Sequence, residues 1–275
     1  MFELPEVVTL ATQVRERLAG RIVVRGSLGA RPHKFVSYNR TPDEFGSLVA
    51  GLTVAGARAL AKWLFIDLEP GYVLAFGECG GRLRLHEAGS PVDRDVHLLL
   101  ELDDGSALSM TTAMWGAMEL HERGAELDRP GARALRPAPI DAGFTIDHLA
   151  SLVAEQASQG RTAKGLLTQE SLVPGVGNAL AQDILFEAGL HPRRPLADLD
   201  RAQVEALHRA IVFTVREAID GGGRDDEVDL FGNPGRYRRR MDRRAVGRPC
   251  PRCGAAVVKL QYLGGACYIC PGCQS

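Results

Sequence analysis

The segment CPRCGAAVVKLQYLGGACYICPGC, residues 250–273, decides the fold of the C-terminal end of the chain. It contains two Cys-x-x-Cys motifs separated by sixteen residues. Each motif places two sulfur atoms on one side of a tight turn, and two such turns complete a tetrahedral zinc site. We therefore expect a structural zinc ion in a ribbon, residues 245–275, that is too small to be stable by apolar burial alone. The expected zinc ligands are Cys250, Cys253, Cys270 and Cys273.

Other metal and redox sites also use cysteines at this spacing. A redox dithiol pair and an iron–sulfur site remain as alternatives to zinc. A zinc deaminase needs an H-x-E element for a ligand and the general acid, and none of the seven histidines lies in one. A site closed by four cysteines also has no open position for a catalytic water. We expect Cys267 to be no ligand and Cys79 to be a packed or free thiol.

Length and composition indicate a globular protein of about two domains. The chain has 275 residues, of which 45% are apolar, enough for a core in each domain. No apolar run approaches the ~20 residues that span a bilayer, and the start lacks the segments of a secretory signal. We therefore expect a cytoplasmic protein with no membrane partner, in a reducing compartment where clustered cysteines bind metals.

The formal net charge of -1 conceals two regions of opposite charge. Residues 64–130 carry thirteen acidic side chains against five arginines. Residues 231–263 carry eight arginines and one lysine against Asp242 alone. Because the local field steers a polyanion, this basic segment favours nucleic-acid binding. A solvated charge run on a connector is the alternative.

Hydrophobic periodicity changes along the chain. Up to about residue 125, an amphipathic helix precedes short apolar or alternating runs that are separated by turn sequences such as EPG and DDG. Residues 126–143 contain several prolines and little periodicity, as linkers do. Residues 144–240 carry apolar residues at helical spacing. The patterns predict an α+β protein: a helix plus β-sandwich or flattened barrel (1–125), a linker, a helical domain (144–240) and the ribbon.

Two glutamates, Glu3 and Glu6, stand beside Pro5 at the start of the chain, MFELPEVVTL. In the first turn of a helix, acidic groups oppose the positive end of the helix dipole, so a capping role is the simplest interpretation. The alternative is that both carboxylates belong to a functional site.

A second group of candidate residues lies in the helical region. In LVPGVGNALAQDILF, residues 172–186, Gly175 and Gly177 end one helix and Asn178 begins the next. Glycines let a backbone approach an anion, and a helix N-terminus offers N–H groups to phosphate. Lys164 would be a second phosphate contact. The alternative is an ordinary glycine turn between two helices, with a surface lysine nearby.

Together these residues resemble the formamidopyrimidine-DNA glycosylase and endonuclease VIII family of base-excision repair enzymes. The resemblance covers nearly the whole chain, in the family's motif order. The matches are the M-P-E-L-P-E start (Glu3, Leu4, Pro5 and Glu6), a β-strand lysine in a context like R-R-A-K-Y-L (Lys62 in RALAKWLF), the G-V-G-N turn (Gly175 to Asn178) and the four-cysteine ribbon.

The resemblance implies a fold, a partner and a set of site residues. It implies a helix plus β-sandwich domain, a helix-two-turn-helix domain and a zinc ribbon, in that order. The implied partner is damaged or abasic double-stranded DNA, bound by a nucleoid-associated monomer. The two glutamates would be catalytic residues in a lesion pocket. The implied DNA-binding residues are Lys62, Lys164, Gly175, Gly177, Asn178 and Trp115.

Several positions depart from the family pattern. The family's second residue is a proline whose freed amine attacks the sugar C1′, whereas Phe2 stands here and disfavours removal of Met1. The ribbon arginine that grips the phosphates is replaced by Gly265. The family's loop supplies a methionine that fills the void left by base flipping, and here that loop, FGECGGR, places Glu78 near this role. Trp115 takes the aromatic wedge position without an arginine beside it. An amine displaced by one residue argues against imine chemistry and lyase activity.

Two hypotheses follow from these observations. In the first, the protein is a monofunctional DNA glycosylase in which Glu3, with Glu6 behind it, activates water for attack on C1′ or stabilises the oxocarbenium-like sugar. In the second, it is a non-catalytic protein that binds damaged, bent or abasic DNA. The retained glutamates favour the enzyme, because acids that repel a polyanion give a pure DNA binder no advantage. A lyase with the Met1 amine or Lys62 as nucleophile is a third alternative.

Overall fold

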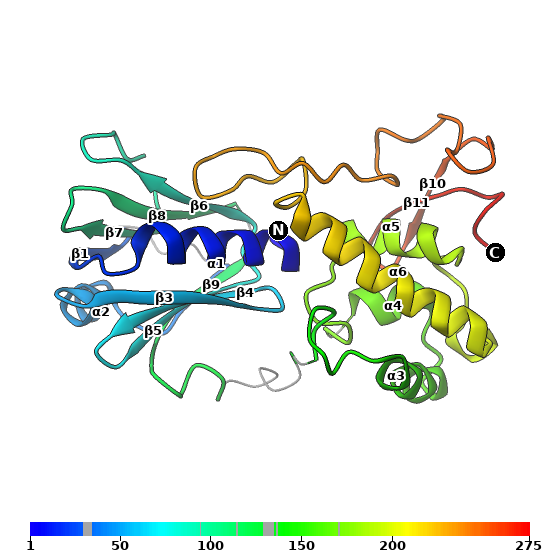
Figure 1. Cartoon of the computed structure of the whole chain (residues 1–275), viewed down its shortest axis with the longest axis horizontal. Helices are drawn as coiled ribbons and strands as arrows, with labels where there is room; N and C mark the ends of the chain where they lie inside the picture. Colours follow the sequence, from blue (N-terminus) through cyan, green and yellow to red (C-terminus); the bar gives the residue numbers. More distant parts are fainter. Residues whose placement is uncertain (30–34, 94, 114, 129–134, 136, 170) are drawn as a thin grey trace. The chain divides into compact units, whose positions relative to one another are not determined.

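The residues of the chain form two compact units (Figure 1). The computed structural model describes residues 1–275 except 30–34, 94, 114, 129–134, 136 and 170, so part of the expected linker 126–143 lies outside the described residues. Each unit is built from two stretches of the chain. The first unit comprises Met1–Arg133 and Gly221–Arg236, and the second comprises Ala134–Asp220 and Tyr237–Ser275.

The first unit is a β-sandwich with a helix at its N-terminus. Its five-stranded sheet has the order β2-β9-β5-β4-β3, and its four-stranded sheet has the order β1-β7-β8-β6. Neighbouring strands are antiparallel except for β2 and β9, which are parallel. The strands are β1 (Val23–Leu28), β2 (Val36–Tyr38), β3 (Thr53–Leu60), β4 (Trp63–Glu69), β5 (Tyr72–Gly77), β6 (Gly81–His86), β7 (Leu98–Leu102), β8 (Ala107–Thr112) and β9 (Gly116–Glu122).

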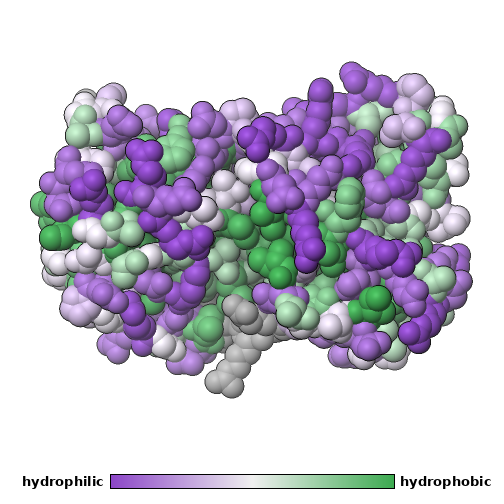
Figure 2. Space-filling view, viewed as in Figure 1, coloured by the Kyte–Doolittle hydropathy of each residue, from purple (hydrophilic) through white to green (hydrophobic). Residues whose placement is uncertain are grey.

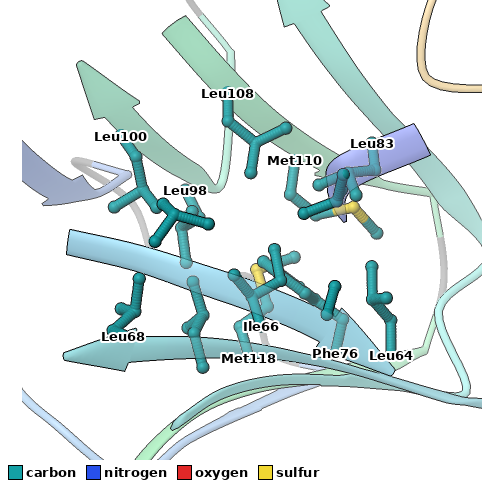
Figure 3. Close-up of a cluster of buried hydrophobic side chains, with 14 of the residues drawn as sticks. Leu64, Ile66, Leu68, Phe76, Leu83, Leu98, Leu100, Leu108, Met110 and Met118 are labelled. Atoms are coloured by element: carbon teal, nitrogen blue, oxygen red, sulfur yellow. The ribbon is translucent and has the colours of Figure 1, made fainter. Parts of the chain in front are cut away.

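Side chains from both sheets meet in the core of the sandwich. On β4, Leu64, Ile66 and Leu68 follow the two-residue period of a strand and point toward the other sheet. Figure 3 shows Leu98 and Leu100 of β7 facing them from the opposite side. These five side chains are at most 3% exposed, so each contributes roughly 1.5–3 kcal/mol through apolar burial. The sandwich predicted from the alternating runs is confirmed.

Two helices accompany the sheets of the first unit. Helix α1 (Leu4–Leu18) buries an apolar face against β3 and β4. Helix α2 (Pro42–Val49) packs on β1. It begins with a capping box, in which the Glu44 amide donates to the Thr41 hydroxyl (3.3 Å) and the Thr41 amide donates to the Glu44 carboxylate (2.9 Å).

The second unit contains helices and a C-terminal hairpin. Helix α5 packs against α6 and against β11, and α3 packs against α6. Of the predicted helical domain, residues 144–240, the part up to Asp220 contains the helices, whereas residues 221–236 group with the first unit. The elements are α3 (Ile146–Ser158), α4 (Ala163–Thr168), α5 (Asn178–Ala188), the 3-10 helix η2 (Leu196–Asp198), α6 (Arg201–Asp220), β10 (Val258–Tyr262) and β11 (Gly265–Ile269).

A buried carboxylate on α5 fixes the chain that leads into the hairpin. Asp183 accepts hydrogen bonds from the Tyr237 hydroxyl (2.6 Å) and from the Met241 amide (2.7 Å). Burial raises the pKa of Asp183, and these hydrogen bonds oppose that rise. Met241 then packs with apolar residues of α5 and the hairpin, and this contact joins the ribbon to the helices.

Polar side chains cover most of the molecular face in Figure 2. Among the described residues, no helix is both long and apolar enough to cross a membrane. The succession of a helix, a sandwich, a helical region and a terminal hairpin confirms the predicted α+β class.

Candidate functional site

One end of the sandwich gathers candidate residues from several loops. In the five-stranded sheet, Trp63 at the start of β4 pairs with Gly77 at the end of β5, and Gly77 pairs with Ala117 of β9. Residues that flank these positions therefore lie at the same edge of the sheet. They are Lys62 before β4, Glu78 after β5 and Trp115 before β9.

The first residues of the chain are fixed at the same edge. The Phe2 amide donates a hydrogen bond to the Cys79 carbonyl (3.0 Å), and the Phe2 side chain lies in the core with 5% exposure. Cys79 is a buried free thiol, as predicted, and burial raises its pKa to about 12. Phe2 therefore anchors the start of α1 through both its side chain and its backbone N–H.

Glu6 is held by a buried arginine of the 221–236 segment. Arg224 Nε donates to Glu6 Oε1 (3.0 Å) and Arg224 Nη2 donates to Glu6 Oε2 (2.9 Å), the two-point geometry that suits a carboxylate. The backbone amides of Arg224 and Glu3 add bonds of 2.9 and 2.8 Å to the same carboxylate. The Arg224 and Glu6 side chains are only 5% and 3% exposed. Because its oxygens are occupied, Glu6 is suited to position other groups rather than to transfer a proton.

Glu3 is the second carboxylate beside Arg224. Its side chain is 5% exposed, and its Oε1 atom lies 3.7 Å from Arg224 Nη1. Burial alone would lower the pKa of Arg224, but the charges of Glu3 and Glu6 outweigh burial and raise it. The two glutamates also form a capping box at the start of α1, so the capping interpretation is confirmed. Capping and a buried charged site are therefore compatible, because the same carboxylates take part in both.

Met1 and Glu227 line a cavity of about 470 Å³. The Met1 amino group forms an ion pair with Glu227 (2.9 Å), and the Met1 carbonyl accepts a hydrogen bond from Arg224 Nη2 (2.8 Å). Arg82 and Thr112 also line this cavity. The volume lies within the range of pockets that take a small molecule or one nucleobase.

Lys62 occupies a turn, not the strand position that the family motif implies. Leu60 of β3 pairs directly with Trp63 of β4, so Ala61 and Lys62 form a two-residue turn. Ala61 takes a φ of 53° to make this turn. The Lys62 carbonyl accepts a hydrogen bond from the Glu78 amide (3.3 Å), which joins this turn to the loop after β5. Lys62, Glu78 and Trp115 are thus brought together at one edge, and Trp115 is 52% exposed.

In the second unit, Lys164 is buried instead of lying on the surface. It is 1% exposed, and its Nζ donates to the Tyr262 carbonyl at the end of β10 (2.7 Å). A Cβ atom at Gly265 would lie 3.5 Å from this Nζ and 3.4 Å from Asn178 Oδ1. The surface-lysine alternative is therefore wrong, and the hairpin brings Gly265 beside Lys164 and the exposed Asn178.

The predicted glycine turn precedes α5. Gly175 has a φ of 89°, a conformation that residues with side chains rarely adopt. Gly177 is the N-cap residue, and its carbonyl accepts the first helical hydrogen bond, from Ala181 (3.0 Å). The turn is confirmed, and its contact with phosphate stays a prediction.

Part of the basic segment is paired within the second unit. Arg240 forms ion pairs with Glu217 (2.8 Å) and Glu187 (3.4 Å), and Arg252 also pairs with Glu187. These pairs attach the segment to α5 and α6. The formal charge of residues 231–263 therefore exceeds the positive charge that remains for a partner.

The four motif cysteines converge on one point. Their sulfur atoms all lie within 4.8 Å of one another, and Cys250 Sγ lies 3.8 Å from Cys273 Sγ. Metal–sulfur bonds of about 2.3 Å in a tetrahedron separate the sulfurs by about 3.8 Å, so the group fits a four-coordinate metal. Cys267 pairs with Leu260 in the hairpin and lies outside the group. The predicted four-cysteine cluster is confirmed.

Comparisons with known proteins identify the family. The model of the formamidopyrimidine-DNA glycosylase N-terminal domain matches residues 1–114, and that of the formamidopyrimidine-DNA glycosylase H2TH domain matches residues 135–228. A formamidopyrimidine-DNA glycosylase of Roseiflexus sp. (strain RS-1) is 33% identical over 285 residues and covers 100% of both chains. The chain belongs to the formamidopyrimidine-DNA glycosylase family.

Another relative and a solved structure agree with this assignment. A formamidopyrimidine-DNA glycosylase of Chloroflexus aggregans (strain MD-66 / DSM 9485) is 33% identical and covers 100% of this chain and 98% of its own. A crystal structure of the Lactococcus lactis Fpg protein with DNA containing an abasic site has a TM-score of 0.86 at 23% identity, and the match covers 99% of each chain. This likeness confirms the fold expected of the formamidopyrimidine-DNA glycosylase family.

Sequence motifs do not reveal every residue of the site. Arg224, Glu227 and Arg82 carry the charges around Met1, yet none of them stands in a motif of the formamidopyrimidine-DNA glycosylase family quoted above. The one available signal is the charged run RDDE directly after GGG, residues 221–227, where helical periodicity ends. A charged run of this kind is most often solvated, so the sequence gives no reason to bury its arginine.

Proposed function

We propose that this member of the formamidopyrimidine-DNA glycosylase family is a monofunctional DNA glycosylase. It binds damaged duplex DNA, flips the lesion and hydrolyses the N-glycosidic bond of the damaged base. The names of the curated relatives and the abasic-site complex of the Lactococcus lactis protein support this substrate class. In this proposal the protein acts as a cytoplasmic monomer.

The observation that carries the proposal is that Arg224 contacts the two glutamates differently. Arg224 binds Glu6 at two points, whereas Oε1 of Glu3 lies 3.7 Å from the same guanidinium and the Glu3 side chain also takes part in the capping box of α1. Glu6 then positions Arg224, and Glu3 activates the water or stabilises positive charge on the sugar. Carboxylates perform both tasks in glycoside hydrolysis.

The surroundings of the two N-terminal nitrogens support water as the nucleophile. In this proposal Met1 is retained, so the nitrogen of Phe2 is an amide that donates to the Cys79 carbonyl, and an amide has no basic lone pair. The Met1 ammonium is paired with Glu227, and an ammonium must lose a proton before it can attack C1′. A covalent sugar intermediate, and the strand cleavage that follows from it, is therefore not part of the proposal.

DNA contacts come from both units in this proposal. In the first unit, Lys62 binds a phosphate and Trp115 enters the unstacked base step. In the second unit, Lys164, Asn178 and the Gly175–Gly177 turn bind the backbone. Within the described residues, Lys164 Nζ has the Tyr262 carbonyl as its hydrogen-bond partner, so an ammonium with three hydrogens retains donors for a phosphate.

A structural zinc ion completes the proposal. Four thiolates in a closed cluster suit zinc, which would stiffen the β10–β11 hairpin beside Lys164. The metal would take no part in the hydrolysis.

A single-turnover assay tests the proposed reaction. Duplexes with an oxidised, ring-opened, alkylated or deaminated base, or an abasic site, are incubated with wild type, Glu3→Gln and Glu16→Gln, with and without borohydride. Glu16 lies exposed on the same helix, so Glu16→Gln controls for the change in charge. We expect wild type and Glu16→Gln to release a base without a trapped adduct, and Glu3→Gln to lose at least about a hundredfold in rate.

The other outcomes separate the competing functions. A borohydride-trapped adduct would show that an amine, from Met1 or Lys62, acts as the nucleophile. Damage-selective binding without base release from any substrate would leave a non-catalytic reader of damaged DNA. The replacement of the family's phosphate-gripping arginine by Gly265 favours that second candidate.

A further inference from the structure

Two aromatic rings lie together at the end of the sandwich. The ring centroids of Phe35 and Trp115 are 4.9 Å apart, and the ring planes are tilted by 47°. Both side chains are well exposed, at 44% and 52%. A large aromatic pair that remains half in water is a candidate contact surface rather than a part of the core.

The strand register explains why these rings meet. Strands β2 and β9 are parallel, and Val36 pairs with Gly116. Phe35 and Trp115 each stand one residue before this pair, at the same end of neighbouring strands. The Gly116 amide donates to the Phe35 carbonyl (3.3 Å), so the hydrogen bonding continues up to the two rings. The pair is therefore positioned by the sheet and not by a free loop.

The backbone of Trp115 is hydrogen-bonded to the wall of the cavity that Met1 lines. The Trp115 carbonyl accepts hydrogen bonds from the Gly80 amide (3.2 Å) and the Thr112 hydroxyl (3.0 Å). Gly80 and Thr112 are both part of the cavity wall. Lys62 lies at the same sheet edge, so a cation accompanies the rings.

We propose that Phe35 and Trp115 act as a single two-ring wedge that stacks on the bases of duplex DNA beside the lesion. The inference rests on the proposed function and adds Phe35, which no sequence motif indicates. Flat aromatic faces stack on any base, and the nearby cation suits the flanking phosphate. Phe35 supports the indole in one orientation, and this lowers the entropy lost when Trp115 enters the base stack. An abasic position, where a base is missing from the stack, is the step that such a wedge fills best.

The test uses a duplex with a tetrahydrofuran abasic analogue opposite 2-aminopurine. Affinity and 2-aminopurine fluorescence are measured for wild type, Phe35→Leu, Phe35→Tyr, Trp115→Leu and the double variant Phe35→Leu/Trp115→Leu. Phe35→Leu keeps an apolar side chain and removes the ring, whereas Phe35→Tyr keeps the ring. Phe213→Leu is the matched control, because Phe213 is also 52% exposed but lies on α6 in the second unit.

We expect Phe35→Leu to weaken binding to the abasic duplex about tenfold and to reduce the fluorescence change. Phe35→Tyr and Phe213→Leu should behave as wild type. The double variant should lose no more affinity than Trp115→Leu alone, since both rings belong to one unit. Wild-type affinity for Phe35→Leu, or additive losses in the double variant, would overturn the two-ring wedge.

Failure of the proposed function would look different. It would appear in wild type itself, either as equal affinity for the abasic and the undamaged duplex or as damage-selective binding without release of any base. Thermal melting followed by circular dichroism identifies any variant that has lost its fold. If Phe35→Tyr and Phe35→Leu melt alike, a difference in DNA affinity between them is due to the aromatic ring.

Discussion

At the scale of single residues, the site depends on one arginine between two carboxylates. Arg224 is separated from Glu6 by 218 positions in the chain, and both side chains are almost fully buried. The attraction between buried charges and the cost of removing them from water are both large, so the loss of one partner leaves an uncompensated charge. Removal of either Arg224 or Glu6 should therefore destabilise the site strongly, although only two side chains form the pair.

The contribution of the Arg224–Glu6 pair to stability can be measured by following the unfolding of the first unit within the full chain. We expect Arg224→Ala to lower the free energy of unfolding by about 3–5 kcal/mol, because Glu6 then lacks its buried partner. Both tryptophans, Trp63 and Trp115, lie in the first unit, so urea denaturation followed by tryptophan fluorescence reports on it selectively.

A control and a second substitution complete the experiment on the pair. Arg25→Ala removes an arginine that is 75% exposed and lies 3.9 Å from Glu101, and it should leave the unfolding midpoint unchanged. Adding Glu6→Gln to Arg224→Ala should recover part of the loss, since the unpaired charge is gone. Unaltered stability of Arg224→Ala would contradict the assignment of this pair.

Cys79 gives a prediction about pH. Burial raises the pKa of its thiol from 9.0 to about 12, so the neutral thiol is favoured throughout the ordinary range and the thiolate appears only as pH rises toward 12. We expect alkylation of Cys79 by iodoacetamide to be far slower than in the urea-unfolded chain, and to keep rising between pH 8 and pH 10. Mass spectrometry of the Cys79 peptide measures this rate, and a plateau near pH 9 would refute the shift.

At the scale of elements, the sequence predicts the modules better than their junctions. The sandwich, the helices and the ribbon follow from local periodicity and motif spacing, and their order is confirmed. The periodicity does not indicate α2, although Thr41, Pro42 and Glu44 carry the signature of a capping box. The Lys62 turn is hidden within a continuous apolar run, because Ala61 adopts a positive φ without a glycine.

Most of the candidate site could be predicted, and its missing part has a physical reason. The N-terminal glutamates, Trp115 and the four cysteines stand in short motifs that a single sequence displays. The partners Arg224 and Phe35 depend on which distant strands and segments pair, and local propensity contains no such information. The same is true of Lys164, whose burial results from its contact with Tyr262 in the hairpin.

The zinc ribbon gives a prediction at this scale. We expect about one zinc ion per chain by plasma mass spectrometry, and its removal by a chelator should disorder β10 and β11, because the hairpin has only a small apolar cluster to hold it. Hydrogen exchange should then increase in Val258–Ile269, and DNA affinity should fall. The fluorescence-detected unfolding of the first unit should stay as it was. Bound iron in place of zinc would contradict a structural zinc ion. The same would follow if the hydrogen-exchange rate of the hairpin did not change when the chelator is added.

At the scale of the whole molecule, net charge does not determine DNA binding. The chain carries -1 overall, but individual cations can still release counterions from DNA. We expect Lys62→Met to reduce the slope of log affinity against log salt by about 0.9, the value of one phosphate contact. Lys259→Met, at an exposed position of β10, should leave the slope unchanged. Equal slopes for wild type and Lys62→Met, measured by fluorescence anisotropy, would remove Lys62 from the interface.

The return of residues 221–236 to the first unit has a consequence for biosynthesis. A ribosome makes the N-terminal sandwich first, and domains usually begin to fold as they emerge. Here the arginine that neutralises Glu3 and Glu6 is translated only after α6, so the start of α1 must wait with unbalanced charge until the first stretch of the second unit, Ala134–Asp220, has been made. The nascent first unit therefore cannot be completed until the helices have been synthesised. A chain released before Arg224 would contain a sandwich in which Glu3 and Glu6 lack their buried partner.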